Sequence, residues 1–251
     1  MESAQIIRNA VASVSALRQA SSAQPALGRA VAHVKRLQSL RFAGTYADLL
    51  GGTQYQEAAR FFLKELYSDQ DYADRDAQFS RIAGALQRLL PQHAVATAVS
   101  LAELHQLTEQ LDHDMAHAWL NLNASTTDAT APQSYVAAWR RVARRNDRQA
   151  QLMRVLGIGR ELDRLTRTPG LQLMLKMMRG PASAAGLASL QHFLEAGFDT
   201  FAAMTRQPGG TKGFLALIEH RETTWITSLF EQDATICATQ LARTMKPAGH
   251  S

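Results

Sequence analysis

The sequence has little cysteine and contains no segment with the pattern of a membrane span or an export signal. Cys237 is its only cysteine, so no disulfide can form within the chain and a reducing compartment is expected. Residues 1–8 include Glu2 and lack an apolar core, unlike a secretory signal. Every apolar stretch is interrupted before it reaches the roughly 18 residues that a membrane span needs. These features predict a cytoplasmic protein without a membrane span.

Alternating runs of β-branched residues, which are typical of strands, are also missing. Leu, Ala, Gln and Arg are abundant instead, and their side chains lose little freedom in a helix. The 251 residues suffice for one large domain, and a hydrophobic fraction of 46% is that of an ordinary globular protein. The sequence therefore predicts an all-α, single-domain bundle of about eight to ten helices over residues 1–251.

Apolar spacing and helix breakers place the main elements. Helical patterns run over residues 27–50, 182–205 and 212–230. Residues 1–24 and 245–251 are expected to be loosely attached ends, and residues 121–132, rich in Asn, Ser, Thr and Ala, predict a long internal loop. The clearest amphipathic helix carries an apolar stripe formed by Tyr55, Ala58, Ala59, Phe62, Leu63 and Leu66.

No catalytic motif stands out, and no catalytic residue is predicted. The sequence lacks a Gly-x-Ser-x-Gly elbow and a dinucleotide-binding fingerprint. Residues 209–213 have the composition of a phosphate-binding loop but not its order. The first expectation for function is a non-enzymatic interaction or regulatory protein. Its partner would be another protein or a second copy of the chain in a homodimer.

Four blocks of the sequence resemble an uncharacterised bacterial family. The most specific block reads Phe-Phe-Leu-Lys-Glu-Leu-Tyr at residues 61–67, followed by Asp71 and Arg75-Asp76, which matches the signature "FFLxxLY…D…RD". Ser68 stands where the family pattern has a glycine. The resemblance implies a bacterial, helical, cytoplasmic protein and brings no known activity with it. The other blocks lie at residues 41–50, 101–105 and 186–195, so the resemblance covers roughly residues 35–225.

His105 is the first candidate for a binding site. It lies at the edge of an apolar helical seam, with Thr108 and Asp112 on the same flank. A half-buried histidine with an acid within reach can act as a general base or as an axial haem ligand. It can equally be a core-edge histidine that is simply hydrogen-bonded to a neighbour. The second functional alternative is thus a haem- or small-molecule-binding helical protein, with or without enzymatic activity, whose pocket lies near His105.

Tyr67, Arg75 and Asp76 are grouped around one predicted turn and are added to this candidate ligand site. An arginine beside such a turn can bind an anion. The structural alternative is a capped corner held by ion pairs.

Glu109, His113 and His117 are a candidate metal site. Their spacing of i, i+4 and i+8 places them on one helix face, where they could hold a divalent metal ion. The alternative is an ordinary surface face, since a structural site usually needs ligands from other elements as well.

Arginine is concentrated in one segment. Residues 139–167 hold nine arginines and three acidic residues, a local charge of +6 in a chain whose net charge is +5. A row of arginines on one helix can bind phosphates, so the third alternative is nucleic-acid binding or another anionic partner. The alternative to binding is a solvated face. The candidate row is Arg140, Arg144 and Arg148, flanked by Arg141 and Arg145.

Overall fold

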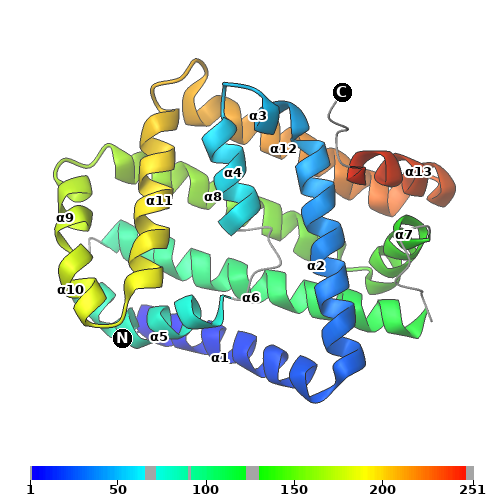
Figure 1. Ribbon diagram of the computed structural model, residues 1–251, viewed down its shortest axis with the longest axis horizontal. Coiled ribbons are helices and arrows are strands. Elements are labelled where there is room, and N and C mark those ends of the chain that lie inside the picture. The colour runs from blue at the N-terminus through cyan, green and yellow to red at the C-terminus, as the bar shows by residue number, and fades with distance from the viewer. Residues whose placement is uncertain (1, 66–71, 90–91, 123–129, 247–251) are drawn as a thin grey trace.

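The computed structural model describes residues 2–65, 72–89, 92–122 and 130–246. Within these ranges the chain is all-helical, as predicted (Figure 1). Thirteen helices are described, more than the eight to ten expected. They are α1 (Glu2–Ala23), α2 (Pro25–Thr45), α3 (Ala47–Gly51), α4 (Gln56–Glu65), α5 (Ala73–Leu89), α6 (Gln92–Asn121), α7 (Ala131–Val142), α8 (Arg145–Thr166), α9 (Leu171–Met177), α10 (Arg179–Ala184), α11 (Ala188–Met204), α12 (Gly210–Glu231) and α13 (Ala234–Met245).

The higher count has local causes. The pattern over residues 27–50 is divided at Tyr46, which ends α2 and precedes α3. The pattern over residues 182–205 is divided by Gly186, whose φ of 67° lies in the left-handed region. The last helix, α13, was not predicted at all. Its start is fixed by Asp233, whose carboxylate accepts hydrogen bonds from two backbone N–H groups of the first turn.

The first helix packs closely, although residues 1–24 were expected to be loosely attached. Ile7 and Val14 are fully buried, and α1 lies along α5 and α6. Pro25 ends α1 without separating it from the bundle. It occupies the first turn of α2, where a backbone N–H has no partner within the helix, so the N–H that proline lacks is not missed. Residues 123–129 of the expected loop and residues 247–251 of the expected C-terminal end lie outside the described residues.

The helices form crossing layers. In Figure 1, α1, α6, α8 and α12 run across the molecule, and α2, α4 and α11 cross them. Neighbouring members of the first set pack together, since α6 contacts both α1 and α8, and α8 contacts α12. At one end, α13 packs against α2 and α7. Within the described part of the chain, no helix combines the length and apolarity needed to cross a bilayer.

Two large apolar clusters hold these layers together. One joins α4, α8, α11 and α12 and includes Phe62, Phe201 and Phe214. Ala58, Ala59 and Phe62 of the predicted stripe are buried on α4, whereas Tyr55 precedes this helix and Leu66 lies outside the described residues. The other joins α2, α6, α7 and α13 and includes Trp119 and Tyr135. Both clusters draw on elements far apart in the sequence.

A buried ion pair connects the two clusters. Arg41 of α2 donates to Glu222 of α12 through Nη1–Oε1 at 3.0 Å and Nη2–Oε2 at 2.9 Å. The Tyr46 hydroxyl donates to the same Oε1 at 3.0 Å. The carboxylate is therefore compensated by a forked guanidinium and a hydroxyl, which offsets much of its desolvation cost.

Candidate functional site

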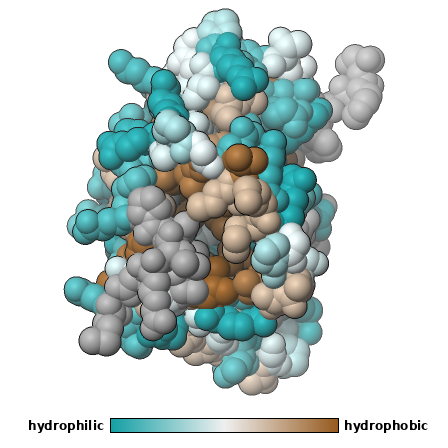
Figure 2. Space-filling view, turned by 90° about the vertical axis from the view of Figure 1, so that its left-hand side faces the viewer, coloured by the Kyte–Doolittle hydropathy of each residue, from teal (hydrophilic) through white to brown (hydrophobic). Residues whose placement is uncertain are grey.

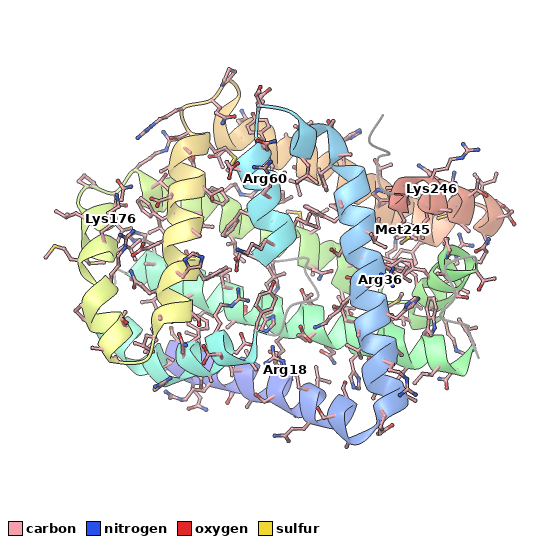
Figure 3. All side chains as sticks on the ribbon, viewed as in Figure 1. Arg18, Arg36, Arg60, Lys176, Met245 and Lys246 are labelled. Atoms are coloured by element: carbon pink, nitrogen blue, oxygen red, sulfur yellow. The ribbon has the colours of Figure 1, made fainter. Side chains whose placement is uncertain are left out.

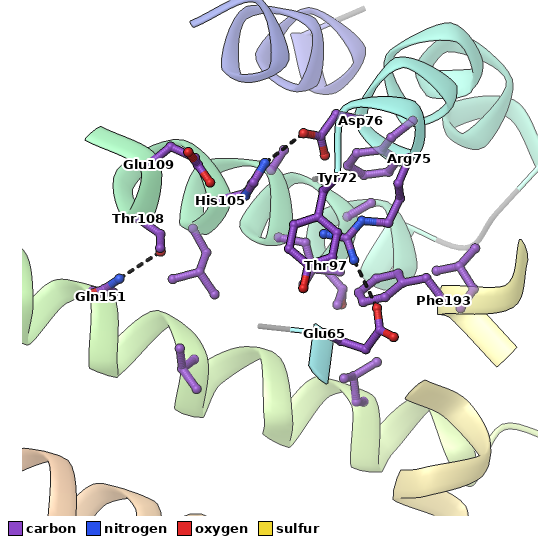
Figure 4. A pocket seen from close by; sticks show the side chains of 18 of the residues that line it. Glu65, Tyr72, Arg75, Asp76, Thr97, His105, Thr108, Glu109, Gln151 and Phe193 are labelled. Atoms are coloured by element: carbon purple, nitrogen blue, oxygen red, sulfur yellow. Dashed lines mark hydrogen bonds and ion pairs between the residues drawn. The ribbon is translucent and has the colours of Figure 1, made fainter. Parts of the chain in front are cut away.

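An elongated cavity of about 250 Å³ lies between α6 and α8. The wall contributed by α6 extends from Ala94 to Asp112, which is about 27 Å at the helical rise per residue. Gln151 of α8 donates to Thr108 Oγ1 at 2.8 Å and fixes the spacing of the two helices (Figure 4). The cavity is thus long, and α6 and α8 form two of its walls.

One end of the cavity is apolar. It lies under α9 and α11 and includes the half-buried side chains of α9 that point inward. Figure 2 shows this side of the molecule, where apolar side chains gather around a hollow. The residues that line this end are Leu162, Leu165, Leu171, Met174, Leu175, Leu190, Phe193, Leu194 and Phe198.

His105 lines the middle of the cavity and binds a carboxylate. Its Nε2 lies 2.8 Å from Asp76 Oδ2, which also accepts a hydrogen bond from Arg18 Nη2 at 2.7 Å. Burial alone would raise the pKa of Asp76, but the hydrogen bonds and charges of His105 and Arg18 outweigh it and lower that pKa. Because an ionised carboxylate only accepts hydrogen bonds, we assign the proton to Nε2 of His105.

This pairing corrects the expected surroundings of His105. The acid within its reach is Asp76 of α5, whereas Asp112 accepts from Gln38 of α2. An axial haem role would require Nε2 to leave Asp76. An oriented, carboxylate-bound imidazole beside a cavity is suited to hydrogen bonding or to proton transfer with a bound molecule.

Arg75 is held beside the same cavity. Its guanidinium carbon lies 4.0 Å from the Tyr72 ring centroid and 4.4 Å from that of Phe193. Its Nη1 contacts Glu65 Oε2 at 3.3 Å. The structure therefore brings Arg75, Asp76 and His105 together, as the candidate ligand site requires, but much of the cation is already engaged. Tyr67, the remaining member of that candidate site, lies outside the described residues.

The other end of the cavity is polar and was not predicted. Lys35 of α2 donates to Glu109 Oε1 at 2.6 Å, and Arg148 of α8 lies with its guanidinium carbon 4.1 Å from the Trp139 ring centroid. Asp112 is fully enclosed, and burial raises its pKa. The signal for this polar end in the sequence was weak. Lys35 and Gln38 lie one helical turn apart in α2, and sequence alone does not show whether such polar residues face a cavity or solvent.

The expected metal site is not assembled. Glu109 is buried and pairs with Lys35, so it does not join the two histidines on an open face. The rings of His113 and His117 pack edge-on with centroids 4.7 Å apart, and burial, followed by the charge of His117, lowers the pKa of His113. Among the described residues, no three His, Cys, Asp or Glu side chains are grouped so that they could hold a metal ion.

The expected arginine row is divided between two helices. Ala143, with φ 54°, ends α7, and Arg144 precedes α8, so residues 140–148 do not form one helical face. Arg144 pairs with Asp114 at 2.6 Å and with Asp147 at 2.7 Å. Arg141 is exposed. The segment therefore offers no continuous basic face for a phosphate backbone.

The remaining arginines of this segment serve packing. Arg140 donates to the backbone oxygens of Leu229 and Gln232 at the end of α12. Arg145 pairs with Glu231. Arg148 is buried and lines the polar end of the cavity. The charge of residues 140–148 is thus largely used to tie α7 and α8 to their neighbours.

Fold and cavity together define a class of protein: an all-α bundle that encloses a long pocket with one apolar and one polar end. The model of a domain of unknown function (DUF8198) matches residues 17–236, and the chain belongs to that family. This agrees with the resemblance to an uncharacterised family. Comparison with curated proteins and with solved structures finds no match.

Proposed function

We propose that this protein binds an amphipathic small molecule in the cavity between α6 and α8. The observation that carries the proposal is the change in polarity along one continuous pocket, from leucine and phenylalanine side chains under α9 and α11 to buried charged groups beside α2 and α7. Ligand sites are typically apolar pockets with a few polar groups that fix orientation. An elongated molecule with an apolar body and one polar end fits this arrangement.

The charges at the polar end favour an anionic head group on the ligand. Lys35, Arg41 and Arg148 supply three cations to the lining. Two carboxylates, Glu109 and Glu222, oppose them, while burial disfavours the charged form of Asp112. A carboxylate or phosphate-like group would therefore meet the cationic hydrogen-bond donors of Lys35, Arg41 and Arg148. At the apolar end, each methylene that leaves water contributes about 0.8 kcal/mol to binding.

His105 and Arg75 lie between the two ends and give the ligand a second polar contact. Asp76 holds the imidazole in one orientation and accepts from Nε2–H, so Nδ1 of the neutral ring can accept a single directed hydrogen bond without rearrangement. This makes His105 a positioning contact for the ligand. Binding without chemistry is compatible with the first expectation of a non-enzymatic regulatory protein. A bacterial, cytoplasmic setting is part of this proposal and rests on the resemblance of residues 61–67.

The proposal is tested by a native mass spectrum of protein purified gently from its host, with an absorption spectrum of the same sample. We expect an added mass of an organic molecule that is lost after denaturing extraction, without a Soret band. A bare polypeptide mass, together with no binding of long-chain anions added to the sample, would contradict the proposal. A Soret band would replace it with the haem alternative.

A further inference from the structure

One short helix at the apolar end of the cavity exposes a cluster of large apolar side chains. Four of the six exposed large hydrophobic residues in the described chain lie in or next to α9, and α9 has no buried residue. Leu173 is 63% exposed and Met177 is 70% exposed. These two residues are one helical turn apart, so they form a single outward ridge. An apolar ridge of this kind marks an interaction surface.

The opposite face of α9 borders the cavity. Leu171 and Leu175 are half-buried and line its apolar end, together with Met174. A single helix therefore separates the apolar end of the cavity from the exposed ridge of Leu173 and Met177.

Basic groups surround the ridge. Residues 160–180 contain five basic and two acidic residues, and the neighbouring α11 adds Glu195, which pairs with Arg179, and Asp199, which accepts from Gln172. Lys176 lies next to the ridge in α9, and Figure 3 places it at the outer edge of the molecule. In each ion pair of this region the cation is the more exposed partner. The side-chain exposures are 69% and 34% for Arg164 and Glu161, 65% and 23% for Arg167 and Asp163, and 60% and 15% for Arg179 and Glu195.

We infer that α9 and its basic surroundings dock on an anionic lipid surface, where an amphipathic ligand enters the cavity. Apolar side chains on a short helix insert at the boundary of head groups and acyl chains, while exposed lysine and arginine contact anionic head groups. This inference rests on the proposed function, because the docked protein would take up the ligand that the cavity binds.

A second copy of the chain fits the same surface less well. A symmetric dimer places the same patch on both sides of its interface, so Lys176 and the exposed arginines would face their own copies. Their like charges would repel one another at a contact that is otherwise apolar. An anionic bilayer presents the opposite charge, so its match to the basic rim favours it as the occupant.

The test is flotation of the full chain with lipid vesicles. We expect the protein to float with vesicles that contain phosphatidylglycerol and not with vesicles of phosphatidylcholine alone, and we expect salt to weaken the binding. Leu173→Asp with Met177→Asp should reduce vesicle binding by more than about tenfold, because it puts anions on the apolar ridge. Both positions are exposed, so the fold should persist. Ile236→Asp is the matched control: Ile236 is 57% exposed but lies on α13, and this variant should float normally.

Three results would overturn the inference. The first is that the wild type does not float, and the second is that the double variant floats as well as the wild type. The third is that neither protein binds vesicles and the wild type forms a concentration-dependent dimer that the double variant does not form. Binding of dansyl-labelled undecanoic acid, measured without vesicles, separates this inference from the proposed function. The double variant should keep its affinity for this probe, since neither changed side chain lines the cavity. Vesicle binding without probe binding would overturn the ligand-entry step and the proposed function together.

Discussion

His105 and Asp76, which are 29 residues apart, join α6 to α5 through a contact of 2.8 Å between Nε2 and Oδ2. Arg18 of α1 donates to the same carboxylate oxygen. One buried carboxylate therefore ties three helices together at the wall of the cavity. Its removal should affect the stability of the bundle as well as the orientation of the imidazole.

Replacing Asp76 with asparagine should destabilise the protein by about 2–3 kcal/mol at neutral pH, because it removes the carboxylate that pairs with Arg18 and His105 in a mostly buried site. The folded-state pKa of Asp76 is lowered, so its contribution is complete above the ordinary value of about 3.9 and is lost as the pH falls through the lower folded-state value. Urea unfolding at several pH values measures this.

The difference between the wild type and Asp76→Asn should shrink as the solution becomes more acidic. Glu57→Gln is the control, because Glu57 forms an exposed pair with Arg60 and its loss should cost less than about 1 kcal/mol. A penalty for Asp76→Asn that stays constant down to acid pH would contradict this account of the site.

Glu222→Gln should cost about 3–5 kcal/mol, because it leaves the Arg41 guanidinium buried opposite a neutral amide. Arg41→Met combined with Glu222→Leu should cost much less than the sum of the two single changes, since no unpaired charge remains. Denaturant unfolding of the wild type, of Arg41→Met, of Glu222→Leu and of the double variant gives the coupling energy. Additive costs would show that the two side chains do not interact as the structure places them.

Asp112→Asn should be neutral or stabilising at pH 7 and above. The folded-state pKa of Asp112 is raised by burial, so the wild type loses stability as the pH rises from about 4 through that folded-state value. Asparagine keeps an oxygen that can accept the hydrogen bond from Gln38 and does not titrate. The free energy of unfolding should therefore depend less on pH in the variant. An unchanged pH dependence would show that Asp112 does not titrate as described.

Gly44→Ala tests the contact between α2 and α13. A Cβ at this position would lie 1.7 Å from the backbone oxygen of Thr244, so α13 must move away. We expect a loss of about 3 kcal/mol or more. Gly51→Ala is the matched control, because a Cβ there meets nothing within 4 Å. Equal thermal stability of the two variants would show that α13 does not pack on α2 this closely.

The elements with a regular apolar period were predictable. The stripe that begins at Tyr55 predicted α4, because residues on one face of a helix recur every three or four positions. The helix α13 was missed, although Asp233 is a recognisable N-cap and Cys237 and Leu241 are buried one turn apart. Its remaining positions are mostly polar or small, so the apolar period was short.

The site itself could be predicted only in part. His105, Arg75 and Asp76 were joined in one candidate ligand site, but the contact between His105 and Asp76 was not predicted, since local spacing does not reveal which helices will pack together. The partners of Glu109 and Asp112 are Lys35 and Gln38, which lie 74 residues away in each case. The arginine row was wrong for a related reason: the left-handed turn at Ala143 has no glycine to mark it.

The most direct test of the account is a fluorescence titration of the protein with dansyl-labelled undecanoic acid. Ala98 of α6 lines the cavity, and Ala98→Phe would fill part of it, whereas Ala98→Ser keeps its volume nearly unchanged. We predict saturable binding at one site in the wild type and in Ala98→Ser. In Ala98→Phe, provided that its circular dichroism is unchanged, we predict an affinity lower by about tenfold or more. No saturable binding by the wild type, or equal binding by a folded Ala98→Phe variant, would contradict the claim that this cavity is a ligand site.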